Sequence, residues 1–191
     1  MSESSNRVPL EESKYQRAST QAPKPGRPGG KFLTFFLASE EYGLEILKVH
    51  EIIGMMPITR VPRTPYFIRG VINLRGKVIP VVDLRLKFAM EAKVQTEETC
   101  IIVVQAQGVE MGIIVDKVSE VLDIASKEID DPPYFGTDVQ TDYLLGIGKA
   151  AERVRLLLDI DKVLSNQEVI DVRSVTAVSA EAASDQGTTA E

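Results

Sequence analysis

Few residues in this 191-residue chain could carry chemistry, because it has one histidine, His50, and one cysteine, Cys100. A Ser/His/Asp or Cys/His catalytic set would have to be built on His50, and a nucleophilic cysteine needs a basic neighbour. His50 lies between Val49 and Glu51, and Cys100 heads an aliphatic run without a basic neighbour. Both patterns are typical of ordinary strand positions, so neither residue is predicted to be catalytic.

Other kinds of chemical site are also poorly represented. One histidine and one cysteine leave almost nothing for a zinc site. Asp83 and Asp159 occupy equivalent places in an internal repeat, which favours a repeated turn or cap over paired acid/base carboxylates. The glycines at 108–112 and 146–148 lack the strand–helix setting of a phosphate-binding loop. The sequence therefore predicts no enzyme activity, no metal and no cofactor.

Composition excludes further classes of protein. A net charge of −6 argues against a dedicated nucleic-acid-binding protein. The longest uncharged apolar runs, such as 78–82 and 100–104, are five residues long, whereas a membrane helix needs about 20. The N-terminus has no apolar stretch typical of a signal peptide, and one cysteine fits a reducing compartment. We therefore expect a cytoplasmic protein.

Composition also divides the chain into three parts. Residues 1–30 are rich in proline and glycine and have no apolar period, which predicts a disordered arm. Residues 166–191 are acidic and are expected to form a disordered tail. The information that specifies the fold lies in 31–165.

The segment 31–165 contains an internal repeat in four blocks. The blocks follow one another in the same order in both copies, which indicates a duplication with seven extra residues in the second copy, near 130–136. A shift of 69 residues aligns 32–35 with 101–104 and 42–53 with 111–122, and a shift of 76 aligns 67–71 with 143–147 and 78–84 with 154–160.

Each copy has about five short, β-branched apolar runs, which predict strands rather than helices. Five short strands in about 45–65 residues suit a small closed barrel, because closure removes exposed sheet edges. We expect a mainly all-β fold of two five-stranded barrels, at about 31–90 and 98–165, with short helical turns and a helix starting near 159. Exchange of strands between the copies stays open. The expected strands are 32–38, 41–46, 49–54, 67–74, 77–82, 99–107, 109–115, 117–123, 143–148 and 153–158.

The two copies differ in charge. Residues 45–90 hold eight basic and three acidic side chains, and 91–165 hold seven basic and fifteen acidic ones. This polarity suits a module that docks two different partners, although unequal drift of solvated faces explains it equally well. Arg75-Gly76, found in the first copy only, predicts a tight hairpin with positive φ at Gly76. An arginine on a rigid hairpin can anchor an interface or simply solvate a turn.

The stretches 32–53 and 64–85, including Gly-Val-Ile-Asn-Leu-Arg-Gly at 70–76, strongly resemble the CheW chemotaxis coupling (adaptor) protein family. The resemblance continues through 112–122 and 143–147 and covers essentially all of 31–165. It implies two SH3-like barrels packed pseudo-symmetrically around a shared hydrophobic core. It also implies a cytoplasmic, non-enzymatic scaffold that binds the regulatory domain of the histidine kinase CheA and the cytoplasmic tips of methyl-accepting chemoreceptors, and is thereby recruited to membrane-bound receptor arrays.

The resemblance also places partner-binding roles on individual residues. For two of these residues, Cys100 and Val121, packing in the core is an alternative to partner contact. Two other functions stay open: a small-molecule-binding β-barrel module with a ligand between the barrels, and a purely structural array subunit. The arm and the long tail, which minimal family members lack, leave open whether the chain serves a main or a parallel pathway. The implied partner-binding residues are Ile46, Val49, Glu51, Gly70, Arg75, Cys100 and Val121.

Overall fold

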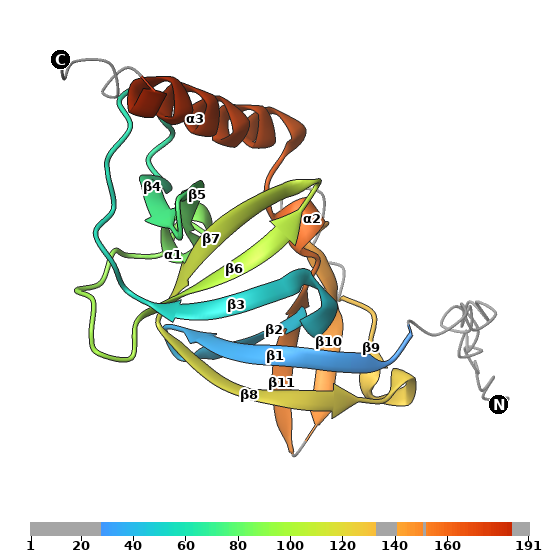
Figure 1. Cartoon of the computed structure of the whole chain (residues 1–191). Coiled ribbons are helices and arrows are strands. Elements are labelled where there is room, and N and C mark those ends of the chain that lie inside the picture. The colour runs from blue at the N-terminus through green and yellow to red at the C-terminus, as the bar shows by residue number, and fades with distance from the viewer. Residues whose placement is uncertain (1–27, 133–140, 151, 185–191) are drawn as a thin grey trace, which may run out of the picture.

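The computed structural model describes residues 28–132, 141–150 and 152–184, with side chains described as far as Val175. One sheet contains β1 (Gly30–Leu37), β2 (Glu40–Glu45), β8 (Lys117–Ile124), β9 (Ile129–Asp130), β10 (Leu144–Ala150) and β11 (Arg153–Leu158). The other contains β3 (Val49–Gly54), β4 (Ile68–Leu74), β5 (Lys77–Asp83), β6 (Cys100–Ala106) and β7 (Val109–Val115). The helices are η1 (Ile46–Lys48), α1 (Leu84–Lys87), η2 (Ser126–Glu128), α2 (Ile160–Val163) and α3 (Asn166–Ser184) (Figure 1).

The all-β prediction is confirmed. Each of the ten expected strands is present with ends within two residues of the expected ones, and the short strand β9 is an addition. Within the described residues, no helix is both long enough and apolar enough to cross a membrane.

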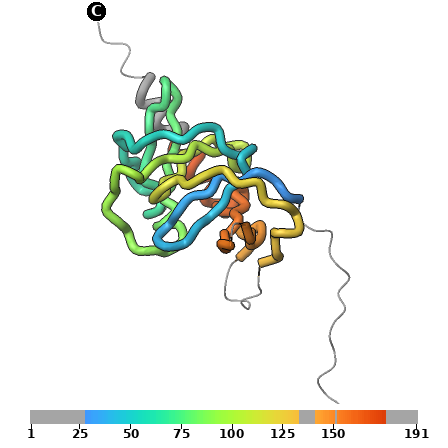
Figure 2. Tube along the Cα trace, turned by 90° about the horizontal axis from the view of Figure 1, so that it is seen from below, coloured from blue at the N-terminus to red at the C-terminus, as the bar shows by residue number. Residues whose placement is uncertain are grey.

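Each sheet contains strands from both copies of the repeat. The six-stranded sheet has the order β8-β1-β2-β11-β10-β9, and the five-stranded sheet has the order β3-β6-β7-β5-β4. Replacing each strand in β8-β1-β2-β11-β10 by its repeat equivalent gives β3-β6-β7-β5-β4, so the two sheets are pseudo-symmetric. Parallel pairs of β2 with β11 and of β5 with β7 join the copies. In Figure 2 the blue trace of β1 runs beside the yellow trace of β8.

The sequence places the two copies at about 31–90 and 98–165 and leaves exchange of strands between them open; in the structure the copies exchange strands. Connection length explains it. Without exchange, β8 would pair with β6 on the side of β6 that faces away from β7. That position is two strand spacings, about 9.5 Å, from β7. A single residue, Asp116, connects β7 to β8, and two extended residue steps span at most about 7 Å. The chain therefore passes to the other sheet.

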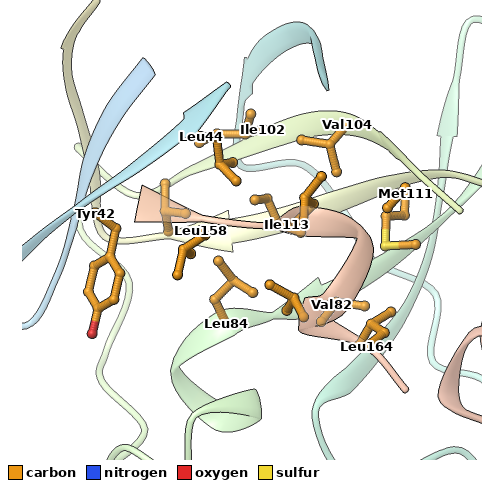
Figure 3. Close-up of a cluster of buried hydrophobic side chains, with 14 of the residues drawn as sticks. Tyr42, Leu44, Val82, Leu84, Ile102, Val104, Met111, Ile113, Leu158 and Leu164 are labelled. Carbon is orange, nitrogen blue, oxygen red and sulfur yellow. The ribbon is translucent and has the colours of Figure 1, made fainter. Parts of the chain in front are cut away.

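Three hydrophobic clusters hold the sheets together. The largest lies between the sheets and is the shared core that the resemblance implied (Figure 3). Each sheet also encloses a smaller cluster, around Ile79 and Val81 in one and around Phe32 and Leu157 in the other. Alternation on β6 serves two clusters, because successive side chains point to opposite faces of a strand: Ile102 and Val104 join the shared core, whereas Ile101 and Val103 join the cluster of their own sheet.

The prediction of a disordered tail over 166–191 is wrong for 166–184, which form α3. Val169, Val172 and Val175 lie three residues apart on one helix face, and each is at most 4% exposed. The helix begins with a capping box, in which Ser165 N donates to Glu168 Oε2 at 2.7 Å and Glu168 N donates to Ser165 Oγ at 3.3 Å. The stripe of three valines is narrow, and this made the acidic segment resemble a solvated tail. Residues 185–191, most of the expected N-terminal arm and part of the extra stretch near 130–136 lie outside the described residues.

Candidate functional site

Asp83 and Asp159 have the cap role that the repeat predicted. Asp83 accepts a hydrogen bond from Leu86 N at the start of α1, and Asp159 accepts one from Asp161 N at the start of α2. Across the described ranges, no group of three or more His, Cys, Asp or Glu side chains is placed to hold a metal ion. The chemistry of the surface therefore lies in its ion pairs and exposed apolar groups.

The β4–β5 hairpin presents Arg75 at its tip. Arg75 and Gly76 have φ of +54° and +87°, the pair of positive values of a type I′ turn, so the positive φ predicted at Gly76 is confirmed. Asn73 Oδ1 accepts from Gly76 N at 2.8 Å and fixes the turn. Arg75 donates to both carboxylate oxygens of Glu51, with nitrogen–oxygen distances of 3.1 and 2.7 Å. This bidentate pair lies at the surface, since the Arg75 side chain is 77% exposed and that of Glu51 27%.

A second group of charges adjoins this pair. Glu110 on β7 accepts a hydrogen bond from Lys77 Nζ on β5, and His50 Nδ1 on β3 lies 3.1 Å from Glu110 Oε1. Hydrogen bonds from Lys77 and His50 lower the pKa of Glu110. We call Glu51, Arg75, His50, Glu110 and Lys77 the β3 charge cluster. Because β3 and β4 are the outer strands of the five-stranded sheet, the Arg75–Glu51 pair also links the β4–β5 turn to the opposite edge of that sheet.

The second copy of the repeat has no arginine at the position equivalent to Arg75. Glu120 corresponds to Glu51, but the positions that correspond to Arg75 and Gly76 are Ala151 and Glu152. The two pseudo-symmetric halves therefore have a similar backbone arrangement but carry different charged side chains on their surfaces.

Ile46 and Val49 lie half-buried against the shared core at the end of β3 that adjoins η1. Cys100 is also half-buried against this core, but it lies beside Gly54 at the other end of β3. Burial raises the pKa of the Cys100 thiol, and a hydrogen bond with the backbone of Val118 on β8 offsets this only in part. A thiol with a raised pKa is a poor nucleophile. Core packing, the alternative considered for Cys100, describes its surroundings.

Gly70 and Val121 lie elsewhere. Gly70 is buried and has φ of +137°, and a Cβ atom there would come within 2.1 Å of Thr59 O. This close approach permits the two hydrogen bonds between Thr59 and Val71, which are 2.8 and 2.9 Å long. Val121 is 49% exposed on β8, so core packing does not describe it. The structure thus brings Glu51 to Arg75 and places Ile46 and Val49 at one end of β3, but Cys100, Gly70 and Val121 lie apart from these two groups.

One exposed residue was missed by the sequence reasoning. Leu47 in η1 is 92% exposed, the largest value among the exposed large hydrophobic residues described. The sequence gives no signal of its exposure, because Leu47 lies in the same apolar stretch as Leu44, which is buried. Leu47 is flanked in sequence by Ile46 and Val49, which are half-buried.

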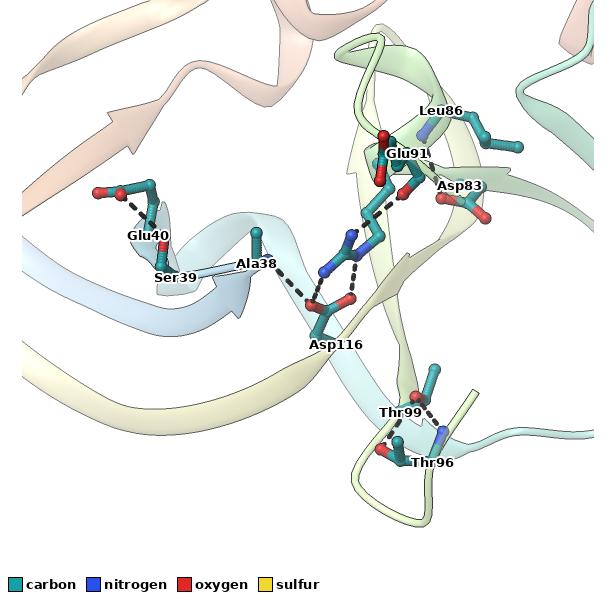
Figure 4. Close-up of polar contacts among 10 residues, drawn as sticks. Ala38, Ser39, Glu40, Asp83, Leu86, Glu91, Thr96, Thr99 and Asp116 are labelled. Carbon is teal, nitrogen blue, oxygen red and sulfur yellow. Dashed lines mark hydrogen bonds and ion pairs between the residues drawn. The ribbon is translucent and has the colours of Figure 1, made fainter. Parts of the chain in front are cut away.

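A pocket of about 710 Å³ lies where the sheets meet near α1. Its charged lining is largely paired within the chain: Arg85 with Asp116, Arg69 with Asp83, and Lys117 with Glu98. Arg85 donates to Asp116 at 2.6 and 2.5 Å and joins α1 to the end of β7 (Figure 4). These contacts favour a joint between elements over a ligand site.

Comparison with known proteins decides the family. The model of the CheW-like domain matches residues 31–168. The chain belongs to the CheW-like family. It is 45% identical over 147 residues to the chemotaxis protein CheW of Klebsiella aerogenes, covering 77% of this chain and 89% of that protein. It is 36% identical over 134 residues to the chemotaxis protein CheW of Helicobacter pylori, covering 70% and 81%.

A solved structure agrees. The scaffolding protein TtCheW from Thermoanaerobacter tengcongensis superposes with a TM-score of 0.68 at 37% identity, covering 73% of this chain and 95% of that one. The CheW-like family is a family of scaffold proteins in chemotaxis signalling, so this member acts as an adaptor and not as an enzyme.

Proposed function

We propose that this CheW-like protein couples the cytoplasmic tip of a methyl-accepting chemoreceptor to the regulatory domain of the histidine kinase CheA, and is thereby recruited from the cytoplasm to membrane-bound receptor arrays. One observation supports the proposal: η1 and β3 together present two adjacent surface areas of different chemistry. The first is apolar, around Leu47, and the second is the β3 charge cluster.

The apolar area is assigned to the receptor tip. Leu47 is 92% exposed, and Ile46 and Val49 lie half-buried on either side of it. Complete burial of a leucine side chain contributes about 1.5–3 kcal/mol. A few such anchors dominate the free energy of most protein–protein interfaces.

The charged area is assigned to the kinase. Arg75 is held by Glu51 in one geometry, so its remaining N–H groups are presented with little loss of side-chain entropy on binding. The excess of basic residues in 45–90 and of acidic residues in 91–165 suits docking of two different partners.

The assignment is tested by titrating receptor tip and kinase regulatory domain separately with Leu47→Ala, Arg75→Ala and the control Val154→Ala. Val154 is an apolar residue on β11 that is 62% exposed. Leu47→Ala should weaken the receptor complex, Arg75→Ala the kinase complex, and Val154→Ala neither. Equal affinities for all four proteins would contradict the proposal.

A further inference from the structure

Lys48, the neighbour of Leu47 in η1, is held by a carboxylate from the C-terminal part of the fold. Its Nζ lies 2.5 Å from Asp161 Oδ2 in α2. The other carboxylate oxygen of Asp161 accepts the backbone N–H of Gln107 at 2.7 Å. Burial would raise the pKa of Asp161, but the hydrogen bonds from Lys48 and Gln107 outweigh it and the pKa is lowered. Asp161 is therefore charged at neutral pH and joins η1, α2 and the β6–β7 turn.

The same turn is attached to α3. The side-chain Nε2 of Gln107 donates to the carbonyl oxygens of Asp161 at 2.5 Å and Leu164 at 3.2 Å. The backbone carbonyl of Gln107 accepts Arg173 Nη2 at 2.7 Å. Arg173 follows the buried Val172 on α3 and lies five residues beyond the end of the family match at residue 168. Contacts therefore run without interruption from α3 to η1.

A related joint is present in the other half. Asp116 accepts the backbone N–H of Ala38 at 2.9 Å as well as the side chain of Arg85 (Figure 4). Ala38 and Gln107 are equivalent in the repeat, and their φ values are +56° and +46°. Arg85 corresponds to Asp161, whereas Asp116 corresponds to Leu47 and Lys48 to Lys117, so the two joints take their acid and their cation from different repeat positions.

We propose that α3 sets the receptor affinity of η1 through Gln107 and Asp161, with Arg173 and Asp161 as positioning residues that touch no partner. This inference rests on the proposed role of Leu47 as a receptor contact. η1 is a three-residue 3-10 helix without a side-chain cap, so its geometry depends on neighbouring elements. Fixing it before binding reduces the conformational entropy that docking would otherwise cost.

The test is a double-mutant cycle on the full-length chain, with Arg173→Ala, Leu47→Ala and the double variant titrated against a purified receptor tip. Gln167→Ala, an exposed change on α3, is the matched control. Arg173→Ala should weaken binding about two- to tenfold, and Gln167→Ala should not. In the Leu47→Ala background Arg173→Ala should cause no further loss, because both act through the same contact. The inference would be overturned if the affinity loss of the double variant equalled the product of the two single-variant losses. It would also be overturned if Arg173→Ala bound the receptor tip as tightly as the wild type does.

Hydrogen exchange of the backbone amides of 46–48 separates this inference from the proposed function. If Leu47→Ala leaves receptor affinity unchanged, the docking role of η1 fails. The structural coupling is still tested by Arg173→Ala, which should speed exchange at 46–48 relative to Gln167→Ala. Unchanged exchange in Arg173→Ala would refute the coupling itself.

Discussion

Gly70→Ala should impair partner binding only by damaging the fold. The resemblance implied a binding role for Gly70, but this glycine is buried where β4 passes the backbone of Thr59. An added Cβ would lie 2.1 Å from Thr59 O and 2.8 Å from Thr59 C, which are backbone atoms that no side-chain rotation can move away.

The expected loss of folding free energy is the sum of the backbone strain and the loss of two hydrogen bonds. A residue with a Cβ at φ of +137° is strained by about 1–3 kcal/mol. Displacing Thr59 breaks two hydrogen bonds to Val71, each contributing about 1 kcal/mol. The free energy of unfolding should therefore fall by about 3–5 kcal/mol. For a domain of this size the melting temperature should fall by about 6–20 °C.

The assay combines urea unfolding of Gly70→Ala with kinase and receptor titrations well below its melting temperature. Gly76→Ala is the matched control, because Gly76 also has positive φ but a Cβ there would meet no atom within 4 Å. It should lose only the strain of about 1–3 kcal/mol. A Gly70→Ala protein as stable as the wild type that has lost partner binding would refute the reasoning and return Gly70 to the interface.

Three further predictions concern ion pairs. Arg75→Ala should lower the free energy of unfolding by less than about 1 kcal/mol but weaken kinase binding by about 1–3 kcal/mol. Urea melts measure the first quantity and titration calorimetry the second. A stability loss as large as the binding loss would make Arg75 a structural residue. Glu51→Lys should weaken kinase binding, and the loss should shrink at higher salt; a salt-independent loss in titrations at two ionic strengths would exclude charge reversal as its cause. Asp116→Asn should cost about 1–3 kcal/mol at neutral pH. Burial would raise the pKa of Asp116, but hydrogen bonds from Arg85 and Ala38 lower it, so its stabilisation is complete above the ordinary pKa and disappears as pH falls through the lowered one. Urea unfolding at several pH values should show wild type and Asp116→Asn converging in acid, and a constant difference would contradict this.

The strands could be predicted from the sequence because their signal is local. Val109–Val115 and Arg153–Leu158 were bounded correctly by turn residues and β-branched runs alone. Strand exchange could not be read this way, since equivalent strands of the two copies carry the same pattern. The length of each connection decides it, and the single residue Asp116 between β7 and β8 is informative only once both strand ends are known.

The candidate site was predicted in part. Arg75 stood out through its glycine neighbour, and Glu51 through the repeat, but their bidentate contact joins strands at opposite edges of a sheet. Leu47 was hidden in an apolar run in which buried and exposed leucines look alike. The helix α3 was missed because Val169, Val172 and Val175 form a narrow stripe that is recognisable only when β4 and β5 are present to cover it.

The central claim is that one chain holds the kinase and the receptor at the same time through neighbouring areas of η1 and β3. Sedimentation velocity of the three purified components, each pair and the full mixture, tests it most directly. The account predicts one complex that contains all three proteins in the full mixture, and much less co-sedimentation of kinase regulatory domain with receptor tip when this chain is left out. Displacement of one partner by the other from this chain would contradict it.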